Sequence, residues 1–448
     1  MLCFMKRSAT FILAAIIFLV PSCGTAPWDS LTASPTETTS THSDADTTSS
    51  ASQTPEPQIL IDTPQILKDR ESGTVVVGSV RNDSDQDFGE ISLEVSLLDI
   101  NGDMLGSQHV SPLLRHLAPG EDSPYAARFE AADGIASAEV ELLHFTTASF
   151  DRASVAFQET KAFTTQDGEY AVLGTVSNPS DEPLTLHDFG ILLEDDSGAI
   201  IDLSRWAAGP ANLMPEEASP VLLLFDTPPD AGEREIYADA TVTRSIAPVE
   251  LTFTREPSLE FTDQGLPFVL GEIHNDAGYF RWVRLLIAAY HAGELLSCTV
   301  TSFPVPIQPD ENRAFLESRL PGLVANAESQ GIPLEDVEIQ VRIELDLSRS
   351  FDETPVPLAI EIDRYQSVGS SLLLHGTIIN TAESIIKQPT VIGTLRTTTG
   401  ELVSAGWSIA ADTLAPAETL DFVLPLTLPQ NTDIVMSEFD LQAVGFYP

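Results

Sequence analysis

The chain has 448 residues, of which 67 are acidic and 22 are basic, so its formal net charge is −45. A surface this acidic repels phosphate backbones and anionic lipid head groups, and we therefore expect no nucleic-acid partner. The acidic residues are spread along the chain rather than gathered in blocks, which favours a role in solubility. Attraction of cations or of basic partners is the alternative interpretation of the same charge.

Residues 1–22 have the composition of a signal peptide. Lys6 and Arg7 supply the positive start, and residues 11–20 form an apolar run of ten residues. A helix needs about 20 residues to cross a bilayer, so this run is too short to span one. Its length and position instead fit the apolar region of a secretory signal.

The signal ends in the sequence LVPSCG at residues 19–24. This stretch resembles a bacterial lipoprotein lipobox, in which an apolar residue stands three positions before a cysteine, a small residue precedes the cysteine and a glycine follows it. Pro21 departs from the residue usual at its place. The resemblance implies cleavage before Cys23 and lipidation of its thiol, which would anchor the chain to a membrane on the extracytoplasmic side. Ordinary secretion with an incidental cysteine is the alternative.

Residues 23–57 hold that cysteine and a linker rich in Ser, Thr and Pro. Such a segment cannot bury enough apolar surface to offset the entropy lost on ordering, so we expect it to be disordered. A flexible chain of about 34 residues reaches on the order of 30 Å. The linker would therefore hold the folded part away from the membrane, and its composition is also one that can carry glycans.

The remaining chain contains the step Gly-x-[Val/Ile]-x-Asn four times. A period near one hundred residues is typical of one small domain rather than of a solenoid. The four glycines are Gly78, Gly174, Gly271 and Gly376, which are spaced by 96, 97 and 105 residues. We therefore predict four similar domains, at residues 58–150, 151–248, 249–354 and 355–448.

The order of expected elements is the same in each repeat. An apolar strand contains the Gly-x-[Val/Ile]-x-Asn step, whose Asn can bond the backbone two residues on, and turn residues follow. In the first repeat residues 91–97 then alternate between apolar and polar, as in a half-buried antiparallel strand, and Asn101-Gly102 indicates a hairpin. A turn with Pro119 precedes the next strand. The later strands are expected at residues 125–129 and 138–145, 221–225 and 235–242, 314–320 and 337–345, and 420–426 and 439–446.

Short strands with frequent turn signals and about 100 residues per unit are typical of β-sandwiches. We predict an all-β chain: a tandem array of four immunoglobulin-like antiparallel β-sandwich domains. The glycine inside the first strand indicates a bulge or the close approach of another backbone. A short helix at residues 323–331, ending at Gly331, is expected in the third repeat.

No motif for catalysis or cofactor binding is found in the sequence, and its eight His are scattered. The best metal candidate begins at Asp99 and resembles the start of a calcium loop, but the twelfth position is Val110 rather than Glu, so a hairpin turn is the preferred interpretation. Weak calcium binding at residues 194–196 with Asp202 stays open. We expect no catalytic, cofactor-binding or metal-binding residues, no cofactor, and a protein that is not an enzyme.

Three further side chains are candidate sites. Cys298 stands alone in the folded part, so it has no internal disulfide partner, and a buried apolar role is favoured over a reactive thiol. Phe280 and Trp282 lie in what reads as an alternating strand, where one of them would face outward. Packing in a core or between domains is favoured for them, with an exposed binding platform as the alternative.

The order of these motifs resembles the FxLYD domain, a small β-sandwich module of bacterial and archaeal surface lipoproteins. The first repeat carries the resemblance through Gly78, Val80 and Asn82, residues 97–99, Gly102 and residues 119–121. Leu98 replaces the usual Tyr, the second repeat keeps Asp195 and Gly198, and the other two are only loosely similar. The resemblance implies a fold and a surface location, and it brings no catalytic residues.

These observations together predict a membrane-anchored extracytoplasmic lipoprotein with a structural, adhesive or protein- or glycan-binding role. The expected partners are the membrane, reached through the lipid at Cys23, and a cell-envelope protein or glycan. The alternative is a substrate-capture lipoprotein that serves a transporter or a cell-envelope enzyme. A two-lobed cleft would favour that alternative.

Overall fold

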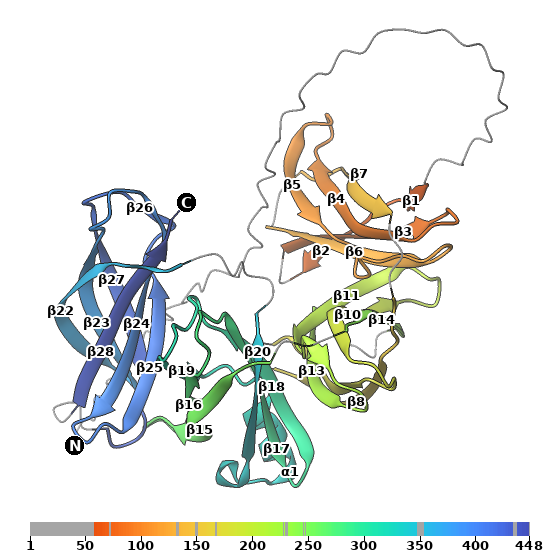
Figure 1. Ribbon diagram of the computed structural model, residues 1–448. Helices are drawn as coiled ribbons and strands as arrows, with labels where there is room; N and C mark the ends of the chain where they lie inside the picture. The colour runs from red at the N-terminus through yellow and green to blue at the C-terminus, as the bar shows by residue number, and fades with distance from the viewer. Residues whose placement is uncertain are drawn as a thin grey trace, which may run out of the picture. The chain divides into compact units, whose positions relative to one another are not determined.

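The computed structural model (Figure 1) describes residues 58–70, 73–130, 134–147, 151–165, 168–226, 228, 232–244, 246, 248–346, 354–432 and 437–447. These residues form antiparallel sheets with one short α-helix and one 3-10 turn, which confirms an all-β fold built from sandwich segments. Contacts join Pro55–Pro448 into one compact unit, so the count of four separate domains stays a prediction. Among the described residues no helix is long and apolar enough to cross a membrane.

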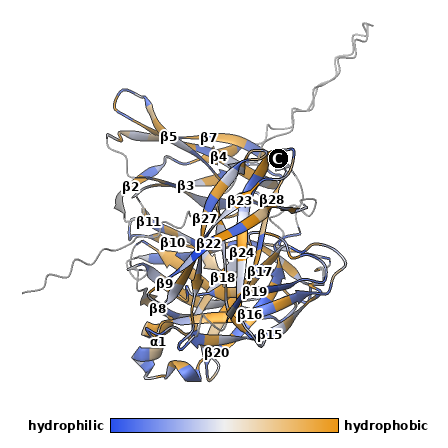
Figure 2. Cartoon of the chain, turned by 90° about the vertical axis from the view of Figure 1, so that its left-hand side faces the viewer, coloured by the Kyte–Doolittle hydropathy of each residue, from blue (hydrophilic) through white to orange (hydrophobic). Residues whose placement is uncertain are grey.

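The first repeat consists of two sheets that enclose an apolar core. One sheet contains β1 (Ile59–Ile61), β2 (Gln65–Arg70), β3 (Gly73–Asn82) and β6 (Asp122–Phe129), and the other contains β4 (Phe88–Leu98), β5 (Met104–Val110) and β7 (Ser137–Thr147). The alternation predicted along β4 is confirmed, because Ile91, Leu93, Val95 and Leu97 are at most 1% exposed. Figure 2 shows such alternation as bands of hydrophobic and hydrophilic residues along the strands.

The second repeat differs because its strands form one continuous seven-stranded sheet. The start of β11 pairs with β10, while Trp206 and Ala208 near its end pair with β13, so this strand links the two layers. Val172, Phe189 and Leu193 belong to the core between them. The strands are β8 (Ala156–Thr164), β9 (Tyr170–Ser177), β10 (Leu184–Glu194), β11 (Ile200–Ala208), β12 (Asn212–Leu213), β13 (Ala218–Phe225) and β14 (Glu233–Val242).

The third repeat has two three-stranded sheets and the helix expected from the sequence. The sheets are β15 (Leu251–Phe261), β16 (Pro267–Asn275) and β19 (Asn312–Glu317), and β17 (Val283–His291), β18 (Glu294–Ser302) and β20 (Glu338–Leu345). Helix α1 (Leu323–Gln330) ends at Gly331, whose φ of 68° is the left-handed conformation that glycine adopts readily, so the predicted helix is confirmed. The 3-10 turn η1 (Leu334–Asp336) follows.

The fourth repeat again has two sheets. One contains β21 (Val356–Pro357), β24 (Ile386–Thr397), β25 (Leu402–Ile409), β26 (Thr413–Leu414) and β28 (Ser437–Phe446), and the other contains β22 (Ala359–Val368), β23 (Ser371–Ile379) and β27 (Thr419–Thr427). Leu374, Ile378, Val391 and Leu424 are fully buried between them. Each of the four repeats thus has a core of its own.

The glycine of each repeat step is required by close packing. A Cβ on Gly78 would lie 2.4 Å from Oη of Tyr125, which stands directly opposite it on β6. At Gly376 a Cβ would lie 2.1 Å from the carbonyl oxygen of Glu361 and 2.8 Å from the ring of Phe422. The register of β22 on β23 shifts beside this glycine, so the predicted bulge and close backbone approach are both present in the fourth repeat. At Gly78 the closest neighbour is instead a side chain.

Two local predictions are wrong. The strand expected at residues 314–320 ends at Glu317, where the side chain accepts a hydrogen bond of 2.7 Å from the N–H of Arg319 and the chain turns away. Phe280 and Trp282 do not lie in a regular strand, because β17 begins only at Val283. The sequence patterns also leave out the first strands of the repeats, such as β8 and β22.

Candidate ligand-binding pocket between the third and fourth repeats

The one site residue named from the sequence, Cys23, lies outside the described residues. The same holds for the signal peptide and for the whole linker at residues 23–57. Lipidation and membrane anchoring therefore remain predictions. The site described below comes from the folded repeats.

The Asn of the repeat step has a structural role. Asn82 is fully buried, and its Oδ1 accepts the N–H of Ser84 at 3.0 Å, which is the turn bond predicted from the sequence. Its Nδ2 donates to the carbonyl oxygens of Gln86 at 2.7 Å and Leu117 at 3.0 Å. The second bond ties two turns that are 35 residues apart. Equivalent bonds are made by Asn178, Asn275 and Asn380.

Acidic residues in the turns also bind backbone. Oε2 of Glu121 accepts the N–H of Ala118 at 2.9 Å, and a Glu at the same place caps the turn in the other three repeats. At the first hairpin, Oδ1 of Asp99 accepts the N–H groups of Asn101 at 2.8 Å and Asp103 at 2.9 Å. These backbone bonds lower the pKa of Asp99. Its carboxylate is therefore occupied by the hairpin turn, which is the interpretation preferred from the sequence over a calcium loop.

In the second calcium candidate, at residues 194–196 with Asp202, the carboxylates of Asp195 and Asp202 accept hydrogen bonds from separate sets of backbone N–H groups. Asp195 accepts the N–H groups of Ser197 at 2.8 Å and Ala199 at 3.0 Å. Asp202 is buried and accepts the N–H groups of Leu203 and Asp226 instead. Across the described ranges, no group of three or more His, Cys, Asp or Glu residues could hold a metal ion.

Cys298 and Trp282 both pack between repeats. The Cys298 side chain is fully buried on β18, in a cluster with Leu173 and Leu222 of the second repeat, and burial raises the pKa of its thiol. Trp282 is 2% exposed and stacks on Phe446 of the fourth repeat, with 5.7 Å between ring centroids. The packing roles predicted for both residues are thus confirmed.

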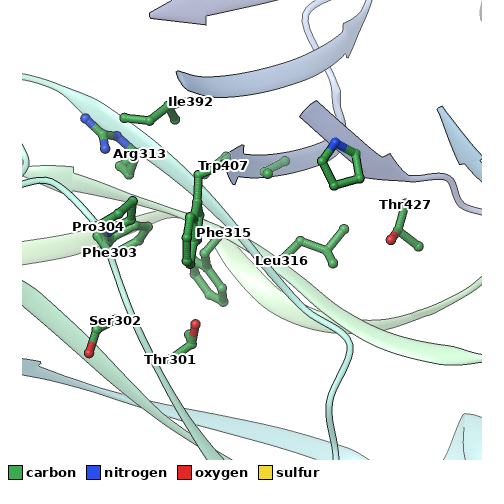
Figure 3. Close-up of a pocket in the computed structure, with 14 residues that line it drawn as sticks. Thr301, Ser302, Phe303, Pro304, Arg313, Phe315, Leu316, Ile392, Trp407 and Thr427 are labelled. Atoms are coloured by element: carbon green, nitrogen blue, oxygen red, sulfur yellow. The ribbon is translucent and has the colours of Figure 1, made fainter. Parts of the chain in front are cut away.

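A cavity of about 200 Å³ opens at the junction of the third and fourth repeats (Figure 3). Phe315 on β19 and Trp407 on β25 lie at its centre in this view, with Arg313 and Ile392 on one side. Trp407 is 44% exposed, so its indole can be reached from solvent. Polar groups come from Thr301, Ser302 and Thr427.

Arg313 contributes a buried guanidinium to the lining of the cavity. Its side chain is 4% exposed, and its Nε donates to Oε1 of Glu311 at 3.0 Å. Nη2 bonds the same oxygen, and the guanidinium lies 6.0 Å from the ring centroid of Phe303. Nη1 is buried and has no hydrogen-bond partner among the described residues. The positive charge at this wall is therefore covered and balanced by Glu311.

A second hollow, of about 420 Å³, shares Thr427 with the first. It is lined by residues of the second, third and fourth repeats, including Phe268, Arg319 and Ser371. Arg319 lies 3.5 Å from the carboxylate of Glu169, and both side chains are exposed. The two hollows offer an aromatic space next to a more polar one.

Comparisons with known proteins do not place the chain in a family. No protein-family model and no curated protein matches it. Among solved structures, it is similar to the native conformation of alpha-2-macroglobulin from E. coli, at 10% identity and a TM-score of 0.13. The match covers 86% of this chain and spans 28% of the length of that protein. A similarity this low carries no argument, and the resemblance to the FxLYD domain stays a prediction.

No sequence pattern predicts the residues of the cavity. Phe303 and Phe315 stand about one hundred residues before Trp407, and no local spacing connects them. The available signal was the large apolar side chain of Trp407 among the small residues Ala405 and Gly406. That signal alone does not tell an exposed aromatic residue from one in the core.

Proposed function

We propose that the chain is a lipid-anchored extracytoplasmic protein whose tandem β-sandwich segments have a structural, adhesive or protein- or glycan-binding role. The observation that carries the binding part is the cavity, whose lining combines the exposed indole of Trp407 with the hydroxyl groups of Ser302 and Thr427. Concave sites with aromatic walls and a few polar groups are the usual form of a binding site. The anchoring part rests on the sequence at residues 19–24.

Anchoring is tested by replacing the cysteine that would carry the lipid. We expect the full-length chain to sediment with membranes and Cys23→Ala to leave the membrane fraction, because two or more acyl chains give stable attachment. Cys298→Ala is the matched control, since this thiol is fully buried and out of reach of a lipid transferase. Equal membrane retention of Cys23→Ala and the unchanged chain would remove the anchoring proposal.

The alternative role is capture of a small free molecule for a transporter or a cell-envelope enzyme. The observation that favours it is the small volume of the cavity, about 200 Å³, and its position between two repeats. Calorimetry separates the two roles, because a capture protein would bind a single small unit as tightly as a chain of such units. Much tighter binding of the chain would favour the adhesive role.

A further inference from the structure

We propose that the cavity between β19 and β25 binds one ring of an uncharged glycan chain. The ring would stack on Trp407 and place its hydroxyl groups against the Ser and Thr residues of the wall. This inference rests on the proposed binding function and names the ligand class for it. Four features of the cavity support it: its size, its aromatic wall, its charge and its hydroxyl groups.

The size of the cavity suits a single ring. Sites for drug-sized molecules have volumes of roughly 300–1,000 Å³. The cavity, at about 200 Å³, is smaller than that range. The second hollow shares Thr427 with it and gives the next unit of a chain a place to lie. One enclosed ring followed by a wider hollow fits a polymer better than an isolated small molecule.

The aromatic wall suits the apolar face of a pyranose ring. Trp407 is 44% exposed, whereas Phe303 and Phe315 behind it are at most 6% exposed. Indole combines a large apolar surface with a polar N–H, so it can pack against C–H groups and still donate a hydrogen bond. The buried phenylalanines support the wall from behind. Trp407 is therefore the residue that the ligand would cover.

The charge of the wall favours an uncharged acceptor. Among the described residues of its lining, the one charged side chain is Arg313, which is 4% exposed and already pairs with Glu311 at 3.0 Å, so an anionic ligand would find no free cation here. It would also meet a chain with a net charge of −45. A hydroxyl or ether oxygen needs no cation and avoids this repulsion.

The hydroxyl groups distinguish a glycan from a peptide. Ser302 and Thr427 lie on the wall, and each hydroxyl can both donate and accept. A sugar ring presents the same type of group around its edge. A proline or aromatic side chain of a peptide would fill the space but would leave these hydroxyl groups without partners. The wall therefore matches a polyol ring better than a peptide side chain.

The test uses the mature full-length protein in a detergent without a sugar head group. Uncharged hexasaccharides of glucose, mannose and N-acetylglucosamine are screened by saturation-transfer NMR, and binders are measured by calorimetry. We expect at least one to bind, and Trp407→Ala to weaken its binding at least about tenfold. Ser302→Ala and Thr427→Val should each weaken it by a smaller factor. The control Tyr447→Ala removes another exposed aromatic residue and should change nothing.

Three results would overturn the inference. They are the absence of any binding hexasaccharide, binding that Trp407→Ala leaves unchanged, and binding confined to anionic glycans or to proline-rich peptides. Far-UV circular dichroism of Trp407→Ala shows whether the variant folds, and Trp407→Phe should restore part of the affinity. Trp407→Ala should remain in the membrane fraction, because anchoring depends on Cys23. If the glycan test fails while the protein stays anchored, this inference is overturned and the anchoring proposal is not.

Discussion

The junction between the first and second repeats and the junction between the third and fourth are built from different chemistry. At the first junction the carboxylate of Asp239 is fully buried and accepts the N–H of Arg115 at 3.0 Å and Nδ1 of His116 at 2.9 Å. At the second, Trp282 stacks on Phe446 beside a cavity. A buried charge must be surrounded by partners. The cavity lies beside the aromatic junction, where Ile392 contacts both the Trp282 cluster and the cavity.

The first junction is also closed by apolar packing. Leu192, Leu203 and Tyr237 of the second repeat join the core cluster of the first repeat. Arg205 pairs with the buried carboxylate of Asp188 at 2.6 Å and also donates to the carbonyl oxygen of Ser111. Packing and charge together specify how these two repeats meet. We expect this junction to be rigid and the aromatic one to carry the binding function.

The largest expected effect is at the aromatic junction. Trp282→Ala should lower the free energy of unfolding by about 4 kcal/mol, because replacing a buried Trp by Ala removes apolar contacts and leaves a cavity. Urea unfolding followed by circular dichroism measures the loss. Trp407→Ala is the matched control, and it should cost less than about 1 kcal/mol because that side chain is 44% exposed. Equal losses would contradict the distinction between a structural and a ligand-facing Trp.

The next effect is at the charged junction. Asp239→Ala should cost about 3 kcal/mol, because it removes the carboxylate that accepts the backbone N–H of Arg115 and pairs with Nδ1 of His116. The same urea titration measures it, and Asp181→Ala in an exposed turn should change stability by less than about 0.5 kcal/mol. A loss at Asp239 no larger than at Asp181 would mean that the buried charge does not hold this junction.

The smallest effect concerns pH at the same junction. Burial lowers the pKa of His187. The neighbouring Asp239 raises this pKa, whereas His116 and Arg115 lower it further, and the net effect is a lowered pKa. The unfolded chain, with a His pKa near 6.5, therefore takes up the proton at higher pH than the folded one, so stability falls as the pH drops below about 6.5. His187→Gln should remove this part of the pH dependence. Thermal unfolding of both proteins at pH 7.5 and pH 5.5 checks it, and parallel losses would refute the role of His187.

Much of the fold could be predicted from the sequence, because local rules produce it. The Asn turn at Asn82, the alternation along β4 and the helix ending at Gly331 all follow from bonds or burial within short segments. Two of the strands that were missed, β8 and β22, are largely exposed. In β22, eight of ten residues are exposed, so this strand has no alternating pattern and is held by its pairing with β23.

The binding cavity could not be predicted, because none of its chemistry is local. Phe303, Arg313 and Trp407 come from separate strands and loops of two repeats. In the sequence Arg313 has the features of an ordinary surface residue of an acidic chain, and only the fold buries its guanidinium at the cavity wall. The FxLYD resemblance covers turn and core positions, so it carried no information about this site.

The sequence by itself determined the repeating unit, the all-β class and the roles of its turn residues, since these depend on interactions within about one hundred residues. The tertiary structure decided which side chains meet between repeats. Whether Trp282 is covered and Trp407 is open depends on how one sheet packs on the next, because burial is a property of the assembled surfaces and not of either residue's neighbours in the chain.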